Sequence, residues 1–185
     1  MGRYLGVMPI LFIILIAGCK SPTEVDSAEL AEYDVSQIRD ETVQDDFLFR
    51  LVSEKEEYKQ GEEVKVYGEI EYIGNQDEVT INHSSSAVLF TVEEKIRGYT
   101  IPDLVQDIGV KTKLNKSKLY RKRYEKNVGF YSEHDPEDYV SFLEDFWERD
   151  DFPAGYYVVN GVADFAHGSE RFEIEAEIDF KVVDE

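Results

Sequence analysis

The alternation of apolar and charged residues near the C-terminus constrains the fold more than any other feature of this sequence. Two sets of side chains alternate there: the apolar residues are Phe172, Ile174, Ala176, Ile178, Phe180 and Val182, and the charged residues between them are Glu173, Glu175, Glu177, Asp179 and Lys181. A period of two residues predicts a β-strand with one buried face and one wet face. Such strands are typical of antiparallel sheets. We therefore expect a half-buried strand over residues 172–183, whose outer acidic residues deter pairing with another chain.

Similar but less regular patterns elsewhere predict further strands joined by short turns. We expect these strands over residues 47–51, 64–72, 79–82, 87–92, 119–124 and 156–165. Residues 98–109 contain Pro102, Asp103 and Asp107, which favour a loop with at most one helical turn. About seven strands with short connections predict a mainly β fold, an antiparallel β-sandwich, rather than alternating β and α units.

One amphipathic helix is expected near residues 136–149, inserted among the strands. Asp135 followed by Pro136 predicts its beginning, with Asp135 as the N-cap and Pro136 at the first helical position. Its apolar side chains recur with helical spacing at Tyr139, Phe142, Leu143, Phe146 and Trp147. The last turn is acidic and opposes the helix dipole, so we expect packing of the aromatic face to stabilise the helix.

The segment Phe152-Pro153-Ala154-Gly155-Tyr156-Tyr157 has the spacing of a tyrosine corner. In this motif a tyrosine hydroxyl, here that of Tyr157, donates a hydrogen bond back to the preceding chain and fixes the start of a strand. Gly155 is the glycine of the motif. The alternative is that Tyr157 is an ordinary core side chain.

The strand region resembles the immunoglobulin-like domains of bacterial envelope lipoproteins and of the BsuPI-type intracellular proteinase inhibitor. The resemblance rests on Tyr58, Gly61-Glu62-Glu63-Val64, residues 66–74 and 79–90, and the tyrosine corner. It covers most of residues 47–183 and implies an immunoglobulin-like sandwich of about seven strands. A proteinase-inhibitor-like role is an alternative that it also implies. The helix expected at residues 135–148 is not part of the inhibitor pattern, and no inhibitory residue can be carried over.

Residues 1–20 combine a charged start, an apolar stretch and small residues before the only cysteine of the chain. The parts are Arg3, residues 7–16 and Ile16-Ala17-Gly18-Cys19. This layout resembles the bacterial lipoprotein signal peptide with its lipobox. The resemblance implies removal of residues 1–18, lipid such as palmitate on Cys19, and anchoring in the cell envelope on the extracytoplasmic side. A transmembrane helix is the alternative, but the run breaks at Gly18, short of the roughly 20 residues that a span needs.

An acidic segment follows Cys19. Residues 21–46 contain nine acidic residues and one basic residue, Arg39, and large apolar residues are sparse. Like charges extend such a segment, so we expect residues 19–46 to form a tether that spans roughly 25 to 30 Å. The folded domain is then expected over residues 47–185. A weak helix over residues 27–34 is the alternative.

The net charge of −20 argues against nucleic acid and against peripheral attachment to anionic lipid. One segment has the opposite sign. Its basic residues are Lys111, Lys113, Lys116, Lys118, Arg121, Lys122, Arg123 and Lys126. Two kinds of partner are open for it: the acidic helix or acidic tether of the same chain, or an external anionic partner such as an acidic wall polymer, lipid headgroups or an acidic protein.

No sequence motif predicts catalysis, a cofactor or a metal site. His83, His134 and His167 are scattered, and Ser84-Ser85-Ser86 is not a nucleophile elbow. The acidic residues around Asp135 lack the ligand spacing of an EF-hand loop. We therefore expect a monomeric, non-enzymatic interaction module anchored to the membrane through Cys19. The alternatives are the inhibitor-like domain and an envelope enzyme with an unrecognised acidic active site.

Overall fold

The computed structural model describes residues 24–101 and 103–184, so Cys19 and the expected signal peptide lie outside the described residues. Within the described residues the chain forms more strands than the seven expected. The elements are α1 (Ser27–Leu30), β1 (Arg39–Gln44), β2 (Phe47–Ser53), β3 (Glu57–Lys59), β4 (Val66–Tyr72), β5 (Glu78–His83), β6 (Val88–Glu94), β7 (Tyr99–Ile101), β8 (Val110–Asn115), β9 (Tyr120–Arg123), α2 (Glu137–Glu148), β10 (Gly155–His167) and β11 (Glu170–Val183). The prediction of a mainly β fold is confirmed.

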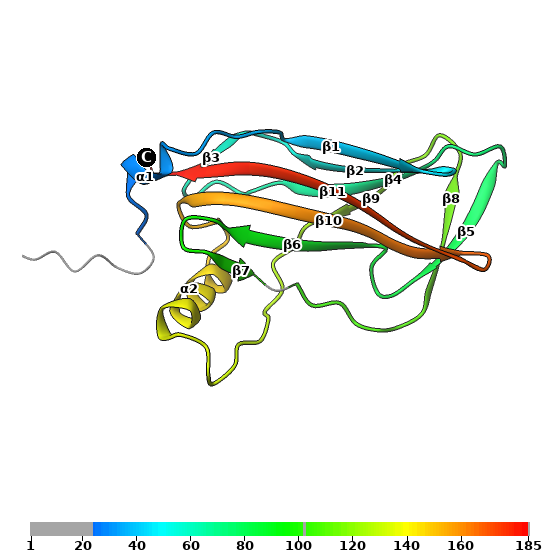
Figure 1. Cartoon of the computed structure of the whole chain (residues 1–185). Coiled ribbons are helices and arrows are strands. Elements are labelled where there is room, and N and C mark those ends of the chain that lie inside the picture. The colour runs from blue at the N-terminus through cyan, green and yellow to red at the C-terminus, as the bar shows by residue number, and fades with distance from the viewer. Residues whose placement is uncertain (1–23, 102, 185) are drawn as a thin grey trace, which may run out of the picture.

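The strands form two sheets, which is consistent with a β-sandwich (Figure 1). The four-stranded sheet has the order β1-β2-β4-β9. In the seven-stranded sheet the order is β3-β11-β10-β5-β8, while β6 pairs with β10 and with β7. The pair β3–β11 is parallel, and the other pairs among the described strands are antiparallel.

The hairpin of β10 and β11 is the longest pairing in the described structure. It runs from Gly155 opposite Val182 to His167 opposite Glu170, and alternate residues of both strands are buried. The buried faces carry aromatic rings that stack on one another, such as Phe165 on Phe172, with ring centroids 5.2 Å apart. The alternation of residues 172–183 therefore does bury one face against the core, as predicted.

Two glycines let the sheets approach closely. A Cβ atom on Gly68 of β4 would lie 2.7 Å from Cγ1 of Val88, and one on Gly161 of β10 would lie 2.8 Å from Cδ1 of Leu51. Both distances are shorter than a carbon–carbon contact, so a larger residue at either position would push the sheets apart.

Residues 98–109, which were expected to form a loop, contain the short strand β7. Ile101 of β7 lies opposite Val92 of β6 and is buried. Three residues are too few to show a period, which is why the alternation gave no signal there.

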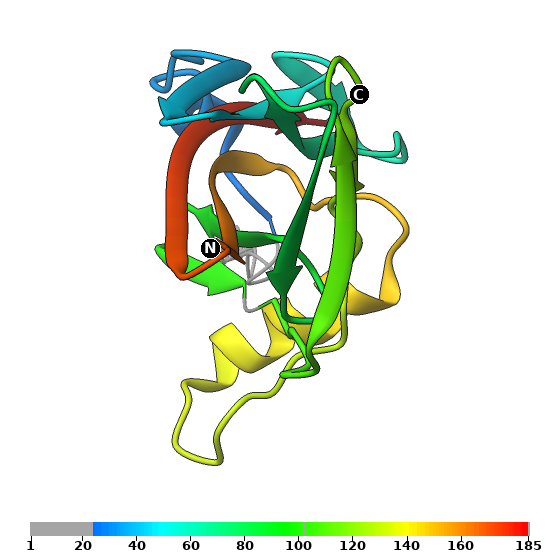
Figure 2. The same cartoon turned by 90° about the vertical axis from the view of Figure 1, so that its right-hand side faces the viewer.

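The predicted helix is confirmed as α2, and its buried residues Phe142, Leu143 and Phe146 belong to the predicted apolar face. Figures 1 and 2 place α2 on the side of the molecule away from β1 and β2. The predicted N-cap is wrong. The helix begins at Glu137 after Pro136, without a side-chain cap. The carboxylate of Asp135 accepts from the N–H of Ser132 at 2.6 Å, because it closes the preceding turn instead.

The segment expected to be a tether is packed onto the sheets from about residue 27. Leu30 of α1 is buried, Tyr33 stacks on Tyr156 with ring centroids 4.7 Å apart, and β1 pairs with β2 along its whole length. The folded domain therefore begins before the expected boundary at residue 46, because residues from about 27 onward already pack on the sheets. Of the alternative helix over residues 27–34, only the single turn of α1 (Ser27–Leu30) is present.

Asp179 holds this N-terminal segment in place. Sequence alternation put Asp179 on the wet face of β11, but the residue is only 4% exposed. Its carboxylate accepts from the N–H groups of Ser36 and Gln37, both at 2.7 Å, and from the hydroxyl of Tyr156. Burial alone would raise the pKa of Asp179, but these hydrogen bonds outweigh burial and lower the pKa.

We predict that a chain beginning at residue 46 is less stable than one beginning at residue 24. The shorter chain loses the burial of Leu30 and two N–H donors to Asp179, as well as the pairing of β1 with β2. We expect the free energy of unfolding to fall by about 3 to 5 kcal/mol, from the lost apolar burial and the carboxylate left with too few donors. Urea unfolding of both chains measures the difference. Equal free energies of unfolding would contradict this role of the N-terminal segment.

Candidate functional site

The structure divides the basic segment into three parts. Lys111 and Lys113 lie on β8, and Lys116 and Lys118 follow in the turn after it. The second part is β9, at the edge of the four-stranded sheet, with Arg121, Lys122 and Arg123. The third is Lys126, which contacts the C-terminal end of α2. The eight basic residues therefore do not form one patch.

The basic residues of β9 are paired with acidic residues of neighbouring segments. Arg121 donates to the carboxylate of Glu69 from Nε at 2.9 Å and from Nη2 at 2.5 Å. Arg123 pairs with Glu63 at 2.7 Å and Lys122 with Glu125 at 3.2 Å. Since their charges are locally compensated, these three residues have a structural role in the sheet.

Glu69 is the buried centre of this arrangement, with 4% exposure. Besides Arg121, it accepts from Arg50 Nη1 at 2.9 Å. Burial would raise the pKa of Glu69, but the two guanidinium groups outweigh burial and lower the pKa. A buried carboxylate with two such partners fixes β9 against β4 and β2.

Lys126 completes the C-terminal end of α2, which no residue of the helix itself caps with a positive charge. Its ammonium group donates to the carbonyl oxygens of Phe146 at 2.6 Å and Arg149 at 3.0 Å, and also to that of Asp151. The same ammonium lies 3.8 Å from the centroid of the Phe146 ring. A cation at this position complements the helix dipole and satisfies carbonyl groups that the helix leaves free. The local sequence pattern gives no signal for this contact, because Lys126 and its carbonyl partners are 20 or more residues apart along the chain.

The four lysines of the first part form what we call the basic tip: Lys111, Lys113, Lys116 and Lys118. All four side chains are exposed. Strands β5 and β8 form an antiparallel ribbon in which Lys111 faces Asn82 and Lys113 faces Thr80. The only ion pair that the described residues make with the basic tip joins Lys113 to Glu78, at 2.6 Å. Positive charge at the other three lysines is therefore uncompensated by direct ion pairing.

The ribbon stands across the end of the molecule that lies farthest from α1 (Figure 1), and Figure 2 shows it in front of the sheets. Register explains this position. Asn82 of β5 pairs with Ala166 near the end of β10, whereas β3 and α1 lie beside Val183, opposite the beginning of β10. A strand of 13 residues is roughly 40 Å long. The basic tip and α1 are therefore at opposite ends of the β10–β11 hairpin.

The intramolecular partners expected for the basic segment differ from those observed. No ion pair among the described residues joins the basic residues of β8, β9 or the turn between them to α2 or to the N-terminal segment. Their partners are Glu63, Glu69, Glu78 and Glu125. Strand pairing selects these partners, because Arg121 lies opposite Glu69 in the β4–β9 register.

The expected hydrogen bond of the tyrosine corner is present. The buried Tyr157 hydroxyl donates to the carbonyl of Pro153 at 2.7 Å. Gly155 has a separate reason to be glycine, since a Cβ there would lie 2.7 Å from Oε1 of Glu94. Glu94 is fully buried and accepts from the N–H of Arg97 at 2.7 Å. Sequence analysis missed Glu94, although it continues the buried phase of Val88, Phe90 and Val92 along β6.

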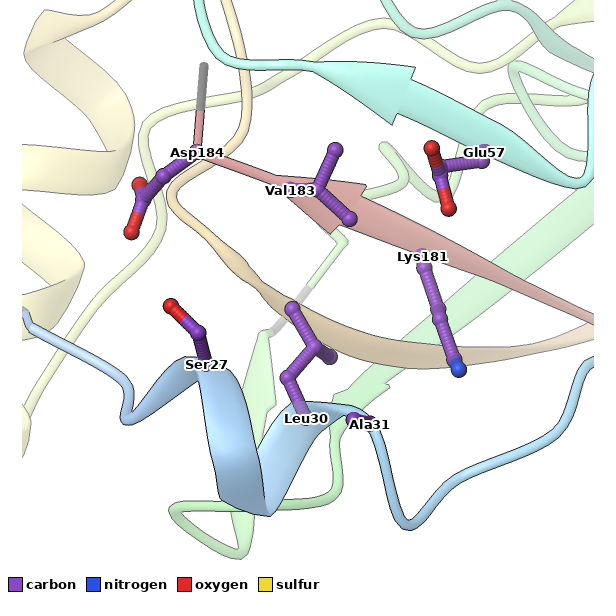
Figure 3. A pocket seen from close by; sticks show the side chains of 7 residues that line it. All are labelled: Ser27, Leu30, Ala31, Glu57, Lys181, Val183 and Asp184. Carbon is purple, nitrogen blue, oxygen red and sulfur yellow. The ribbon is translucent and has the colours of Figure 1, made fainter.

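Three hollows in the surface have volumes of about 380, 450 and 540 Å³. The first lies between α1 and the ends of β3 and β11, where Leu30 points toward Val183 (Figure 3). Charged groups of Glu57 and Lys181 border it, so the hollow mixes apolar and charged walls. None of these three hollows is lined by a lysine of the basic tip.

A second surface feature that sequence analysis missed is the loop between β9 and α2. Residues 127–131, which we call the apolar loop, expose Val128 to 73%, Phe130 to 80% and Tyr131 to 45%. The signal in the sequence was three apolar residues in a stretch without period-two or helical spacing.

We predict a pH dependence of stability that Lys126 causes. Burial lowers its pKa from the ordinary 10.5 to about 8, while Asp151 acts in the opposite direction. The unfolded state then holds this proton more tightly, so the free energy of unfolding should rise as pH increases above about 8. Allowing for the exposed part of the side chain, the rise between about pH 7 and 9.5 should be about 1 kcal/mol larger in the wild type than in Lys126→Met. Urea unfolding across this range gives the two slopes; equal slopes would show that Lys126 does not titrate there.

No protein-family model and no curated protein matches this chain. Two searches within the described residues were also negative: neither helix is long and apolar enough to cross a membrane, and no group of three or more His, Cys, Asp or Glu side chains could hold a metal ion.

Proposed function

We propose that this chain is a lipid-anchored, non-enzymatic binding module of the bacterial cell envelope, and that its basic tip binds an anionic polymer. The observation that carries the proposal is the uncompensated charge of Lys111, Lys116 and Lys118 at the end of the molecule farthest from α1. Among the described residues, four exposed lysines have no ion pair, and three of these, Lys111, Lys116 and Lys118, gather at the tip while Lys59 lies apart on β3.

The position of Cys19 in the sequence supports an orientation in which the basic tip points away from the membrane. Only five residue steps separate Cys19 from Glu24, the first described residue, and they can span at most about 18 Å. Lipid on Cys19 would therefore hold the α1 end of the domain close to the bilayer. The basic tip would then point away from the membrane, toward polymers of the envelope.

Screening decides whether an acidic protein can bind a polyanion. At physiological ionic strength the Debye length is about 8 Å, much shorter than the roughly 40 Å between the two ends of β10. A polymer at the tip is therefore screened from the acidic residues at the α1 end, and the acidic residues that lie beside the lysines are Glu78, paired with Lys113, and Asp77, whose carbonyl accepts from the N–H of Lys116. A lysine beside an anionic surface contributes about 1 kcal/mol, so three of them are sufficient for a weak, salt-dependent contact.

The open surface of the tip also favours a polymer over a small ligand. The ribbon of β5 and β8 has a single acidic residue, Glu78, and its lysines line none of the three hollows described above. Charge displayed on an exposed ribbon can follow an extended partner along its length. Small ligands bind in concave sites that enclose most of their surface.

We also propose that the sandwich is immunoglobulin-like. The hydrogen bond from Tyr157 to Pro153 and the packing of two mainly antiparallel sheets support this assignment. The inhibitor-like and enzymatic alternatives stay predictions from the sequence, because no described feature favours either of them.

We predict that replacing the three unpaired lysines abolishes most polymer binding. Full-length protein in vesicles of neutral lipid is mixed with labelled poly(glycerol phosphate), and the variant Lys111→Ser/Lys116→Ser/Lys118→Ser is compared with the wild type. Its affinity should fall by about tenfold or more at about 50 mM salt, with a shallower salt dependence. The variant Cys19→Ser should no longer be found in the membrane fraction, but it should still bind the polymer.

The matched control is Lys55→Ser/Lys65→Ser/Lys95→Ser, which removes the same charge from exposed lysines that pair with Glu62, Glu54 and Glu93. This control should bind nearly as tightly as the wild type. Equal weakening of both triple variants would show that only net charge matters and would contradict a binding role of the tip.

A further inference from the structure

The apolar loop gathers three exposed apolar side chains within four positions. Val128 and Phe130 have the two largest exposed fractions among its large apolar side chains, and Tyr131 is also exposed. Isolated apolar residues on a surface are ordinary, but three of them within four positions form a patch. Such patches mark surfaces that another molecule covers.

The loop is held at both ends, so its apolar side chains cannot easily turn inward. Before it, Asn127 Nδ2 donates to Asp103 Oδ1 at 2.8 Å. At its other end the Tyr131 hydroxyl donates to Glu144 at 2.8 Å, and the Tyr131 ring stacks on Trp147. A surface fixed before binding loses less conformational entropy on association.

The charge around the loop specifies the partner. Residues 127–148 contain seven acidic residues and no lysine or arginine. The exposed acidic residues beside the loop and on α2 are Glu133, Glu137, Asp138, Glu144 and Glu148. An apolar centre with a negative rim complements an apolar segment with positive flanks, and it repels an anionic membrane surface.

We propose that the apolar loop and the acidic face of α2 form a docking surface for a cationic amphipathic segment of a partner protein. This surface is separate from the basic tip and of opposite sign, so the proposal holds whether or not the tip binds a polymer. Val128 and Phe130 supply the apolar contact, and the acidic residues of α2 select the positive partner.

Trp147 makes the proposal testable without a label, because it is the only tryptophan of the chain and lies against Tyr131. The probe is an 18-residue amphipathic peptide of leucine and lysine without aromatic residues. Full-length protein in neutral-lipid nanodiscs is titrated while the fluorescence of Trp147 is recorded. We expect a saturable change with the leucine–lysine peptide and a much weaker one with a peptide in which serine replaces leucine.

Two variants separate apolar docking from general attraction to an acidic protein. Val128→Ser/Phe130→Ser should weaken peptide binding by about tenfold or more, since both side chains lose apolar contact area. The matched control Val43→Ser/Ile73→Ser changes two other exposed apolar residues and should leave affinity within about twofold. Unchanged circular dichroism and melting temperature show that both variants fold.

Three results would overturn the proposal. The first is equal binding of the leucine–lysine and serine–lysine peptides, which would mean that charge alone attracts them. The second is equal affinity of the loop variant and the wild type. The third is that sedimentation of the full chain shows self-association which Val128→Ser/Phe130→Ser abolishes, since the occupant would then be a second copy.

Discussion

The hairpin of β10 and β11 is the constraint on which the rest of this structure depends. Its residue pairs run without interruption from Gly155 opposite Val182 to His167 opposite Glu170. One end of the hairpin carries β3 and α1, and the other end carries the ribbon of β5 and β8. Along its length it packs on the four-stranded sheet, which Gly161 allows to approach closely. The hairpin therefore fixes the distance between two ends that differ in chemistry.

Sequence patterns predicted the parts whose residues interact mainly through a regular repeat. Alternation gave residues 172–183 as a half-buried strand, and helical spacing gave the apolar face of α2. The N-terminal segment was misjudged because its stability depends on a distant residue. Asp179 receives hydrogen bonds from Ser36 and Gln37, more than 140 positions away. Acidic composition alone cannot reveal that such a segment finds donors and partners in the folded state.

Charge counting found the basic segment but could not divide it. Whether a basic residue is free or paired depends on strand register, which sets Arg121 against Glu69 and leaves Lys111 opposite Asn82. Lys126 is a third case, since it stabilises a helix end through carbonyl oxygens rather than carboxylates. The candidate site is consequently smaller than the sequence indicated, and its position on the molecule is more informative than its total charge.

Our central claim is that the chain meets an anionic polymer at the end farthest from its expected lipid anchor. Amide hydrogen exchange of the full-length protein, with and without poly(glycerol phosphate), tests it most directly because exchange reports where the polymer lies. We predict that the polymer slows exchange in residues 110–119 and leaves residues 27–38, at the α1 end, unchanged. Slower exchange in residues 27–38, with no change in residues 110–119, would contradict the account.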